Sequence, residues 1–175
     1  MSDTDDLTPD FIREFQETRR HLPHWQAPGE THYLTFTLLD RHACDLTRAA
    51  LAHIIVGALQ FRHEERYTLL DWVIMPDHVH LILYPMMAEN GFFSLSKIMG
   101  SMKGWTAHEI NRNISQRSSL WQDESFDRVI RSDGEYRKHA FYIWMNPVEA
   151  GLVENPRDWP WWGQGWFCRG MQMSE

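Results

Sequence analysis

Two histidines that are separated by a single residue, His78 and His80, form the first pattern in this chain that could support chemistry. They begin residues 78–84 (HVHLILY), whose β-branched and aromatic content predicts a strand. Side chains two positions apart on a strand point to the same face, so both imidazoles would face one way and Val79 would face the core. Two imidazoles on a rigid element can bind one metal ion. Such a pair also arises by chance in a chain with ten histidines, so an ordinary strand position stays open as well.

A tyrosine and an asparagine, Tyr142 and Asn146, form the second pattern. They lie four positions apart in residues 134–148, a segment with helical spacing, and would share one face of the helix. The amide oxygen of Asn146 is a hard ligand of the kind that suits Mg²⁺ or Mn²⁺, and such an ion polarises a phosphoryl group. A tyrosine beside it could attack phosphorus and form a covalent ester, which splits one difficult step into two. Alternatively, Tyr142 is a core residue and Asn146 ends the helix before Pro147.

Two further side chains could assist at such a site. His139 precedes Tyr142 by one helical turn, where it could help to deprotonate the tyrosine or contact DNA, or be an ordinary partly buried histidine. Asp77 could accept a hydrogen bond from a ligand imidazole and so orient it. The position of Asp77 after Pro76 equally suits a turn.

Charge is distributed unevenly along the chain. The net charge of −7 argues against nucleic-acid binding, because phosphate contacts require a surplus of lysine and arginine. Residues 91–138 are nevertheless net positive, with eight basic and six acidic side chains, so a polyanion would dock there unless this is an ordinary solvated surface. Tryptophans also gather in the second half, where one or two could stack on bases while most belong to the core. The predicted DNA contacts are Lys103, Arg112, Arg128 and Arg131.

Length and composition limit the class of protein. The 175 residues, of which 43% are hydrophobic, fit one globular domain with a sizeable core. No run approaches the roughly 18 apolar residues of a membrane span, and the acidic N-terminus is unlike a secretory signal, so we expect a soluble, cytoplasmic protein. Cys44 and Cys168 lie far apart and are expected to be reduced thiols. We expect an N-terminal arm at residues 1–30, with a helix starting near Thr8, and one domain at 31–175 that includes a Trp- and Pro-rich tail.

The expected elements have the order of a known α+β architecture. The order strand–helix–strand–strand–helix–strand–helix is that of a ferredoxin-like split βαβ, with an antiparallel sheet, helices packed on it, and an extra C-terminal helix that carries Tyr142. Residues 67–84 would form a hairpin that turns at Pro76 and Asp77. Strands are predicted at 31–39, 67–75, 78–84 and 125–131, and helices at 45–62, 94–113 and 134–148, the last interrupted late by Pro147.

The segments around the two patterns resemble a known family. Residues 72–83 (WVIMPDHVHLIL) resemble the His-hydrophobic-His (HUH) metal motif of the single-tyrosine transposases, and residues 142–153 (YIWMNPVEAGLV) resemble the nucleophile helix of that family. Residues 102–107 (MKGWTA) and 120–131 (LWQDESFDRVIR) are similar to segments of its REP-associated tyrosine transposase branch. The resemblance extends from about residue 31 to residue 162. Two long motifs in the right order are far more specific than either short pair.

The resemblance implies a fold and a reaction. The family has a ferredoxin-like domain and cleaves single-stranded DNA, often beside a hairpin. A tyrosine attacks the scissile phosphate, keeps the 5′-phosphate and frees a 3′-OH. A divalent ion, Mg²⁺ or Mn²⁺, is held by both histidines and by a polar residue one turn after the tyrosine. In this chain those roles fall on His78, His80, Asn146 and Tyr142. Relatives include monomers and dimers, so either state is compatible with the sequence.

The sequence therefore favours a metal-dependent single-stranded DNA endonuclease and strand transferase that acts at hairpin DNA. A DNA-hairpin-binding protein without catalytic activity is the alternative, because it would need the basic segment and the aromatic rings but no working tyrosine. A metallohydrolase acting on small phosphoesters would need further acidic or histidine ligands, which the sequence does not place.

Overall fold

A computed structural model of the chain describes residues 29–164, and the fold is argued from this range. Residues 1–28 of the arm predicted at residues 1–30, with its helix near Thr8, lie outside the described residues, as do Trp166 and Cys168. In the described part, none of the helices combines the length and apolar character that crossing a membrane would require.

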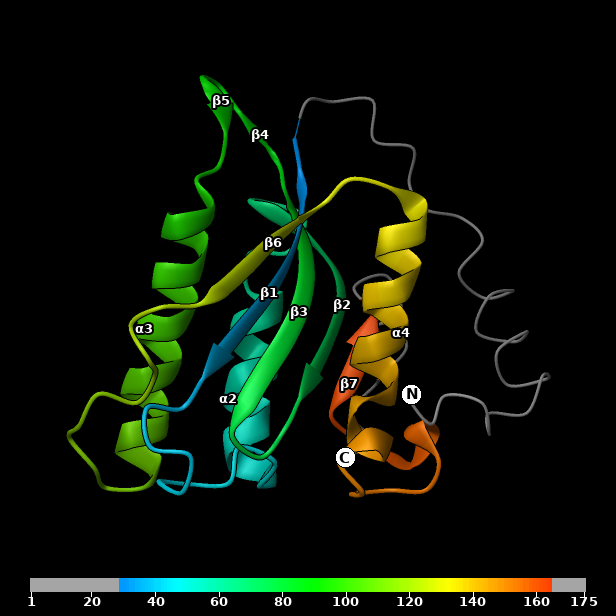
Figure 1. Cartoon of the computed structure of the whole chain (residues 1–175). Helices are drawn as coiled ribbons and strands as arrows, with labels where there is room; N and C mark the ends of the chain where they lie inside the picture. The colour runs from blue at the N-terminus through cyan, green and yellow to red at the C-terminus, as the bar shows by residue number, and fades with distance from the viewer. Residues whose placement is uncertain (1–28, 165–175) are drawn as a thin grey trace, which may run out of the picture.

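A five-stranded antiparallel sheet forms the centre of the structure (Figure 1). The first βαβ unit contains β1 and β2, and β3 lies between them; the second contains β3 and β6, and β1 lies between them. This split order confirms the predicted ferredoxin-like arrangement. The strands are β1 (Thr31–Thr37), β2 (Tyr67–Ile74), β3 (His78–Pro85), β6 (Phe126–Ile130) and β7 (Trp162–Gln164), and their order in the sheet is β6-β1-β3-β2-β7.

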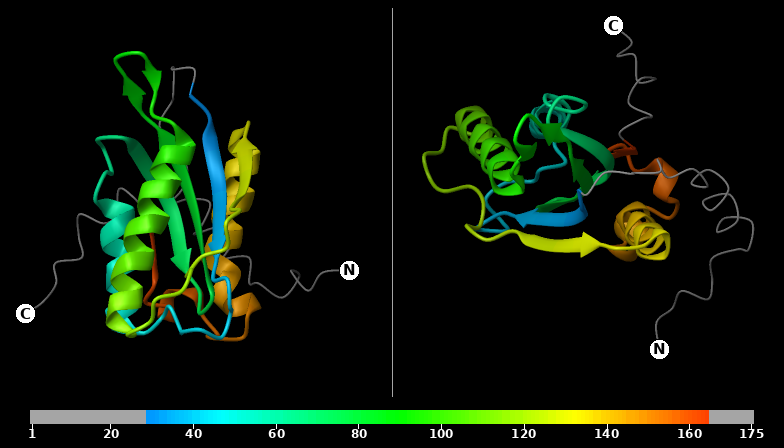
Figure 2. Two further views of the ribbon diagram at one scale, coloured as in Figure 1. Left: turned by 90° about the vertical axis from the view of Figure 1, so that its left-hand side faces the viewer. Right: turned by 90° about the horizontal axis from the view of Figure 1, so that it is seen from above.

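Helices cover both faces of the sheet, as the two views in Figure 2 show. On one face, α2 (Ala49–Gln60) and α3 (Leu95–Asn113) pack on a core that includes Val79 and Leu81 of β3. On the other, α4 (Asp133–Glu149) packs on a smaller core that includes Ile82 of the same strand. Alternate residues of β3 therefore face different helices, as the period of two requires. The face that carries α4 is the face of the even-numbered residues, and His78 and His80 belong to it.

The helix ends differ from the predicted ends by up to four residues, and two of the differences concern how a helix starts or stops. Helix α2 begins at Ala49 rather than at residue 45, because the Asp45 carboxylate accepts hydrogen bonds from the amide and the hydroxyl of Thr47, at 2.9 and 2.5 Å, and holds a turn there. Helix α4 is not interrupted by Pro147 but continues to Glu149. Pro147 has no N–H to donate to the carbonyl of Ile143, so one helical hydrogen bond is lost. The bonding resumes beyond it, where the amide of Ala150 donates to the carbonyl of Asn146.

Four short elements were missed by the sequence analysis. Strands β4 (Met87–Ala88) and β5 (Gly91–Phe92) form a small hairpin, and a 3-10 turn, η2, spans Pro156–Asp158. The fourth is strand β7, which pairs with β2 and places the start of the predicted tail on the edge of the sheet. Elements of two or three residues are too short to show a periodic pattern.

The edge pairing of β7 depends on a glycine. Gly163 lies opposite Trp72 of β2, and a β-carbon at position 163 would come within 2.7 Å of Cζ2 of the buried indole. We expect Gly163→Ala to lower the free energy of unfolding by about 1–3 kcal/mol, because the enclosed ring cannot move away. Urea denaturation followed by circular dichroism would measure this.

Gly104→Ala in α3 is the matched control. A β-carbon there would meet nothing within 4 Å, so the substitution should instead raise stability by up to about 1 kcal/mol through helix propensity. Equal unfolding midpoints for wild type and Gly163→Ala would contradict the close approach of this backbone to Trp72.

Candidate active site

The two histidines of β3 meet on the face of the sheet that α4 covers. Their ring centroids are 4.6 Å apart, and the rings are nearly perpendicular, at 78°. Val79 between them is completely buried in the opposite core. The predicted geometry, with two imidazoles on one face of a rigid strand, is confirmed.

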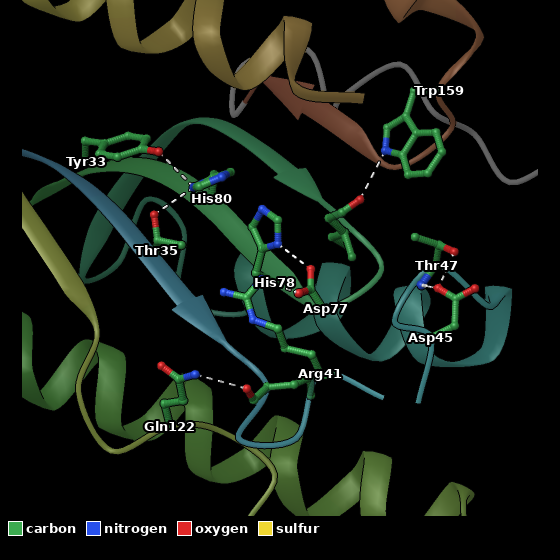
Figure 3. Close-up of polar contacts among 12 residues, drawn as sticks. Tyr33, Thr35, Arg41, Asp45, Thr47, Asp77, His78, His80, Gln122 and Trp159 are labelled. Carbon is green, nitrogen blue, oxygen red and sulfur yellow. Dashed lines mark hydrogen bonds and ion pairs between the residues drawn. The ribbon is translucent and has the colours of Figure 1, made fainter. Parts of the chain in front are cut away.

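Strand β1 holds the second histidine in place. His80 pairs with Thr35 across the sheet, and its Nδ1 lies 2.7 Å from the Thr35 hydroxyl and 2.8 Å from the Tyr33 hydroxyl (Figure 3). A proton on Nδ1 can be donated to one of these oxygens, which leaves the lone pair on Nε2. Nε2 itself is buried and has no hydrogen-bond partner among residues 29–164. A buried polar atom without a partner is destabilising, so this nitrogen suits a bound ligand such as a metal ion.

Asp77 and Arg41 hold the first histidine. The Nδ1 of His78 lies 2.6 Å from one carboxylate oxygen of Asp77, and the Arg41 guanidinium donates to the other at 2.8 Å. Burial raises the pKa of Asp77, but the hydrogen bond with His78 and the charges of His78 and Arg41 outweigh burial, so the net pKa is lowered. An ionised Asp77 favours the proton on Nδ1 of His78 and leaves Nε2 as the free ligand atom. The hydrogen bond between Asp77 and His78 is the contact that the orienting role predicted for Asp77 requires.

Helix α4 places Tyr142 over the histidine pair. The ring centroid of Tyr142 is 5.4 Å from that of His80 and 6.4 Å from that of Tyr33, with both contacts edge-on. Its side chain is 39% exposed, so it can be reached from solvent. His139, one turn earlier, stacks on Tyr33 at 4.5 Å. Asn146, one turn later, is only 7% exposed and lies on the same side of the helix as Tyr142.

Buried polar contacts fix α4 against the sheet. The Tyr136 hydroxyl in α4 donates to the Asp71 carboxylate of β2 at 2.5 Å, and both side chains are buried. Just after the helix, the Trp159 indole donates to the carbonyl of Ile74 at 3.1 Å (Figure 3). The helix begins at Ser132, whose hydroxyl accepts from the amide of Glu135. The Tyr136–Asp71 hydrogen bond therefore joins the first turn of α4 to the sheet, and the Trp159 contact joins the segment that follows the helix to β2.

The predicted DNA contacts do not gather at one place. The Lys103 ammonium donates to the carbonyls of Gln122 and Asp123, at 2.7 and 3.1 Å, and to the hydroxyl of Ser125 at 3.1 Å, which occupies its three donors. Lys103 thus holds the loop before β6, and its phosphate contact stays a prediction. Arg112 pairs with Glu109 on α3, which covers the opposite face of the sheet from α4.

The other two predicted contacts lie nearer the histidines. Arg128 is on β6 opposite Tyr33 of β1, and its exposed guanidinium is 3.8 Å from Glu135, the distance of a weak surface pair. Arg131 follows β6 directly, and its backbone amide donates to Glu135 at 2.8 Å. Arg128 and Arg131 are therefore the two predicted contacts on the side where Tyr142 lies.

Sequence reasoning missed Tyr33, Thr35 and Arg41. The first two lie in a segment that reads only as a strand, and their role depends on which strand lies beside β3 and in which register. They could have been found only by predicting that the strand at residues 31–39 pairs with the strand that carries His78 and His80. Arg41 lies in a turn, where no sequence pattern indicates its contact with Asp77.

The described residues contain no cluster of three or more His, Cys, Asp or Glu side chains that could hold a metal ion. His78 and His80 are thus not joined by a third side chain of these types. Asn146, the third ligand that the sequence predicts, carries a neutral oxygen of the kind that hard divalent ions accept.

Burial gives His80 a testable dependence on pH. Burial, followed by the neighbouring charge of His78, lowers the pKa of His80 to about 3. Below the unfolded pKa of about 6.5 the unfolded chain binds a proton that the folded chain does not, so the stability contributed by neutral His80 is lost as pH falls. We expect the free energy of unfolding of wild type, measured in EDTA, to fall as the pH drops below about 6.5. It should fall by up to about 1.4 kcal/mol per pH unit more than that of His80→Gln.

Urea unfolding of both proteins at several pH values between about 7 and 5 would measure this difference. His80→Gln cannot titrate, so it carries the acid sensitivity of every other group and serves as the control. Parallel stability curves would show that His80 is not held neutral in the fold.

Comparison with known proteins identifies the family of the chain. Residues 41–133 match the sequence model of the IS200-like transposases. Over 137 residues the chain is 28% identical to the REP-associated tyrosine transposase of Escherichia coli K12, an alignment that covers 75% of this chain and 74% of the relative. The fold is shared with a REP-associated tyrosine transposase solved bound to a REP hairpin, at a TM-score of 0.62 and 24% identity over 81% of each chain. Since the family match spans more than half of its residues, the chain belongs to the IS200-like transposase family.

Proposed function

We propose that the protein is a metal-dependent endonuclease and strand transferase for single-stranded DNA, with Tyr142 as its nucleophile. The observation that carries the proposal is the position of a solvent-accessible tyrosine beside two histidines, one of which has a buried, unpartnered Nε2. Hairpin DNA of the REP type is the proposed substrate, because one relative of the same fold has been solved bound to a REP hairpin.

Tyr142 suits the role of nucleophile better than its neighbour Tyr33. The Tyr33 hydroxyl contacts His80, and burial raises its pKa to about 12, so it stays protonated and enclosed. Tyr142 is more exposed and lies at the edge of the same aromatic cluster. A nucleophile must reach phosphorus, which favours the accessible ring.

The proposed reaction exchanges one phosphodiester bond for another. The Tyr142 oxygen attacks the scissile phosphorus, the bond between phosphorus and the 3′-oxygen breaks, and the 5′-phosphate remains on the tyrosine. The phenolic proton must leave, and the departing 3′-oxygen takes up a proton. His139 can accept the phenolic proton, since burial, with smaller effects of Arg128 and Lys138, lowers its pKa and keeps its imidazole neutral. Attack by another 3′-OH on the ester completes strand transfer.

His78 and His80 would hold the divalent ion through their Nε2 atoms, and Asn146 would add its side-chain oxygen. Their Nδ1 atoms already contact Asp77 and the β1 hydroxyls, which is how ligand imidazoles are oriented in metal sites. Bound Mg²⁺ or Mn²⁺ supplies polarisation of the phosphoryl oxygens and stabilises the charge that develops there.

A covalent adduct tests the proposed function. Wild type, incubated in Mg²⁺ or Mn²⁺ with hairpin-bearing single strands from the chromosome that encodes it, should form a protein–DNA adduct that survives a denaturing gel. Tyr142→Phe should form none, because it lacks the attacking oxygen but keeps the ring. Tyr84→Phe, at the far end of β3, is the control and should form the adduct. Hairpin binding by wild type without any adduct would contradict catalysis and favour a DNA-binding protein.

Metal affinity tests the ligand set without DNA. His78→Ala, His80→Ala and Asn146→Ala should each weaken Mn²⁺ binding by at least about 10-fold, because even groups that only orient a ligand contribute about 10- to 100-fold. Isothermal titration would measure the affinities, and EDTA should abolish adduct formation.

His108→Ala is the matched control, since this histidine is exposed on α3. Its Mn²⁺ affinity should equal that of wild type. Equal affinity of the three ligand variants and wild type would contradict the proposed site.

A further inference from the structure

Phe126 is an exposed aromatic side chain on the face of the sheet that carries the histidines. It is the first residue of β6 and lies directly opposite Thr35 in the pairing with β1. Directly opposed residues of an antiparallel pair point to the same face, and Thr35 points to His80. The ring is nevertheless 56% exposed, whereas Ile130 at the other end of the strand is buried in the core under α4.

Ring contacts connect Phe126 to the proposed nucleophile. The Phe126 ring meets Tyr33 edge-on at 6.0 Å, and Tyr33 in turn meets Tyr142 edge-on at 6.4 Å. The Phe126 and Tyr142 rings are thus no further apart than these two distances together. A strand whose phosphate lies at Tyr142 has its flanking bases within reach of Phe126.

The surroundings of Phe126 suit an anionic strand. Arg128, two residues along β6, points to the same face and is exposed. Lys138 is exposed on α4, next to His139. The acidic side chains nearby are Glu135, 3.8 Å from the Arg128 guanidinium, Asp127, which pairs with His32, and Glu124 in the loop before β6. Strand β6 is at the edge of the sheet, so no further strand covers this side in the described residues. An open aromatic face beside cations is what single-strand binding sites present.

Scattered exposed hydrophobic residues are common and need no explanation by themselves. Phe61, at the C-terminal end of α2, is such a case: it is 71% exposed and lies far from the histidine face. Phe126 differs in its place in the aromatic cluster that contacts both His80 and Tyr142.

We propose that Phe126 is a base-stacking residue that positions the single-stranded DNA next to the scissile phosphate. This rests on the proposed function and deepens it, since it assigns a nucleotide-binding position beside Tyr142. Stacking does not depend on which base is present, so Phe126 would fix the placement of the strand rather than read its sequence.

The test measures stacking directly on the full chain, with Tyr142→Phe present so that the DNA stays intact. The probe is a REP-type hairpin from the chromosome that encodes the protein, with a single-stranded extension that carries 2-aminopurine at each position in turn. Fluorescence should be quenched at one extension position on binding. Adding Phe126→Leu should abolish that quenching and weaken binding by about 5- to 100-fold, whereas Phe126→Trp should retain both.

Three controls separate stacking from a structural role. The same hairpin trimmed to its duplex should bind Phe126→Leu as tightly as its parent. Mn²⁺ affinity should be unchanged in Phe126→Leu, which would show that Tyr33 and His80 keep their places. Phe61→Leu, a substitution of the other exposed phenylalanine, should change neither quenching nor affinity.

Different outcomes overturn different claims. If Phe126→Leu binds the extended hairpin and quenches as its parent does, the inference is wrong and the proposed function stands. Equal weakening for extended and trimmed hairpins, or a change of oligomeric state in light scattering, would show that Phe126 supports the fold or contacts a second copy. If protein with an intact Tyr142 neither binds the hairpin nor forms the adduct, the proposed function fails and this inference fails with it.

Discussion

The burial of one imidazole between two strands is the constraint on which the site depends. His80 is 6% exposed, and a buried histidine is stable only if its ring nitrogens are satisfied and its charge is suppressed. The hydroxyls of Tyr33 and Thr35 satisfy one nitrogen, and they can do so only because β1 lies beside β3 in a register that sets Thr35 opposite His80. The second nitrogen is left available on the same face as the Nε2 of His78. The split order of the sheet is thus a chemical requirement of the site as well as a packing solution.

The same face must also hold α4 close enough for Tyr142 to reach the histidines. A face that carries two imidazoles has less apolar surface with which to bind a helix than the opposite face, which packs against two helices. Aromatic rings and buried hydrogen bonds compensate for this. Tyr33 stacks on both His80 and His139, and Tyr136 donates to the buried Asp71. Stacked rings supply contact area while they keep polar atoms available, so one set of residues anchors the helix and forms the site.

How much the sequence could predict depends on how local each feature is. The shared face of His78 and His80 follows from a period of two within one strand, and the turn between Tyr142 and Asn146 follows from helical spacing; both needed only neighbouring residues. The partners of His80 could not be found that way, because Thr35 is 45 positions away and its role depends on strand order and register. The role of Lys103 was likewise hidden, since its partners lie in a loop about 20 residues further on. Pro147 was misread because propensity describes a helix interior and not its last turn.

The distribution of charge along the sequence and its distribution in the structure lead to different conclusions about DNA. The net charge of −7 predicts weak attraction for any polyanion, and the structure removes Lys103 and Arg112 from the side where Tyr142 lies, so that the basic segment does not act as one patch. A protein with this surface that cleaves DNA, as proposed, cannot rely on many phosphate contacts, and nonspecific binding to duplex DNA should be correspondingly weak. Its affinity would have to come from terms that do not scale with protein charge, namely base stacking and the metal ion at the histidines. Stacking requires exposed bases, and the metal ion contacts one phosphate. A single strand beside a hairpin offers both the exposed bases and the phosphate. An excess of acidic over basic side chains is then consistent with the proposed nuclease, which would bind its hairpin substrate and not the surrounding duplex DNA.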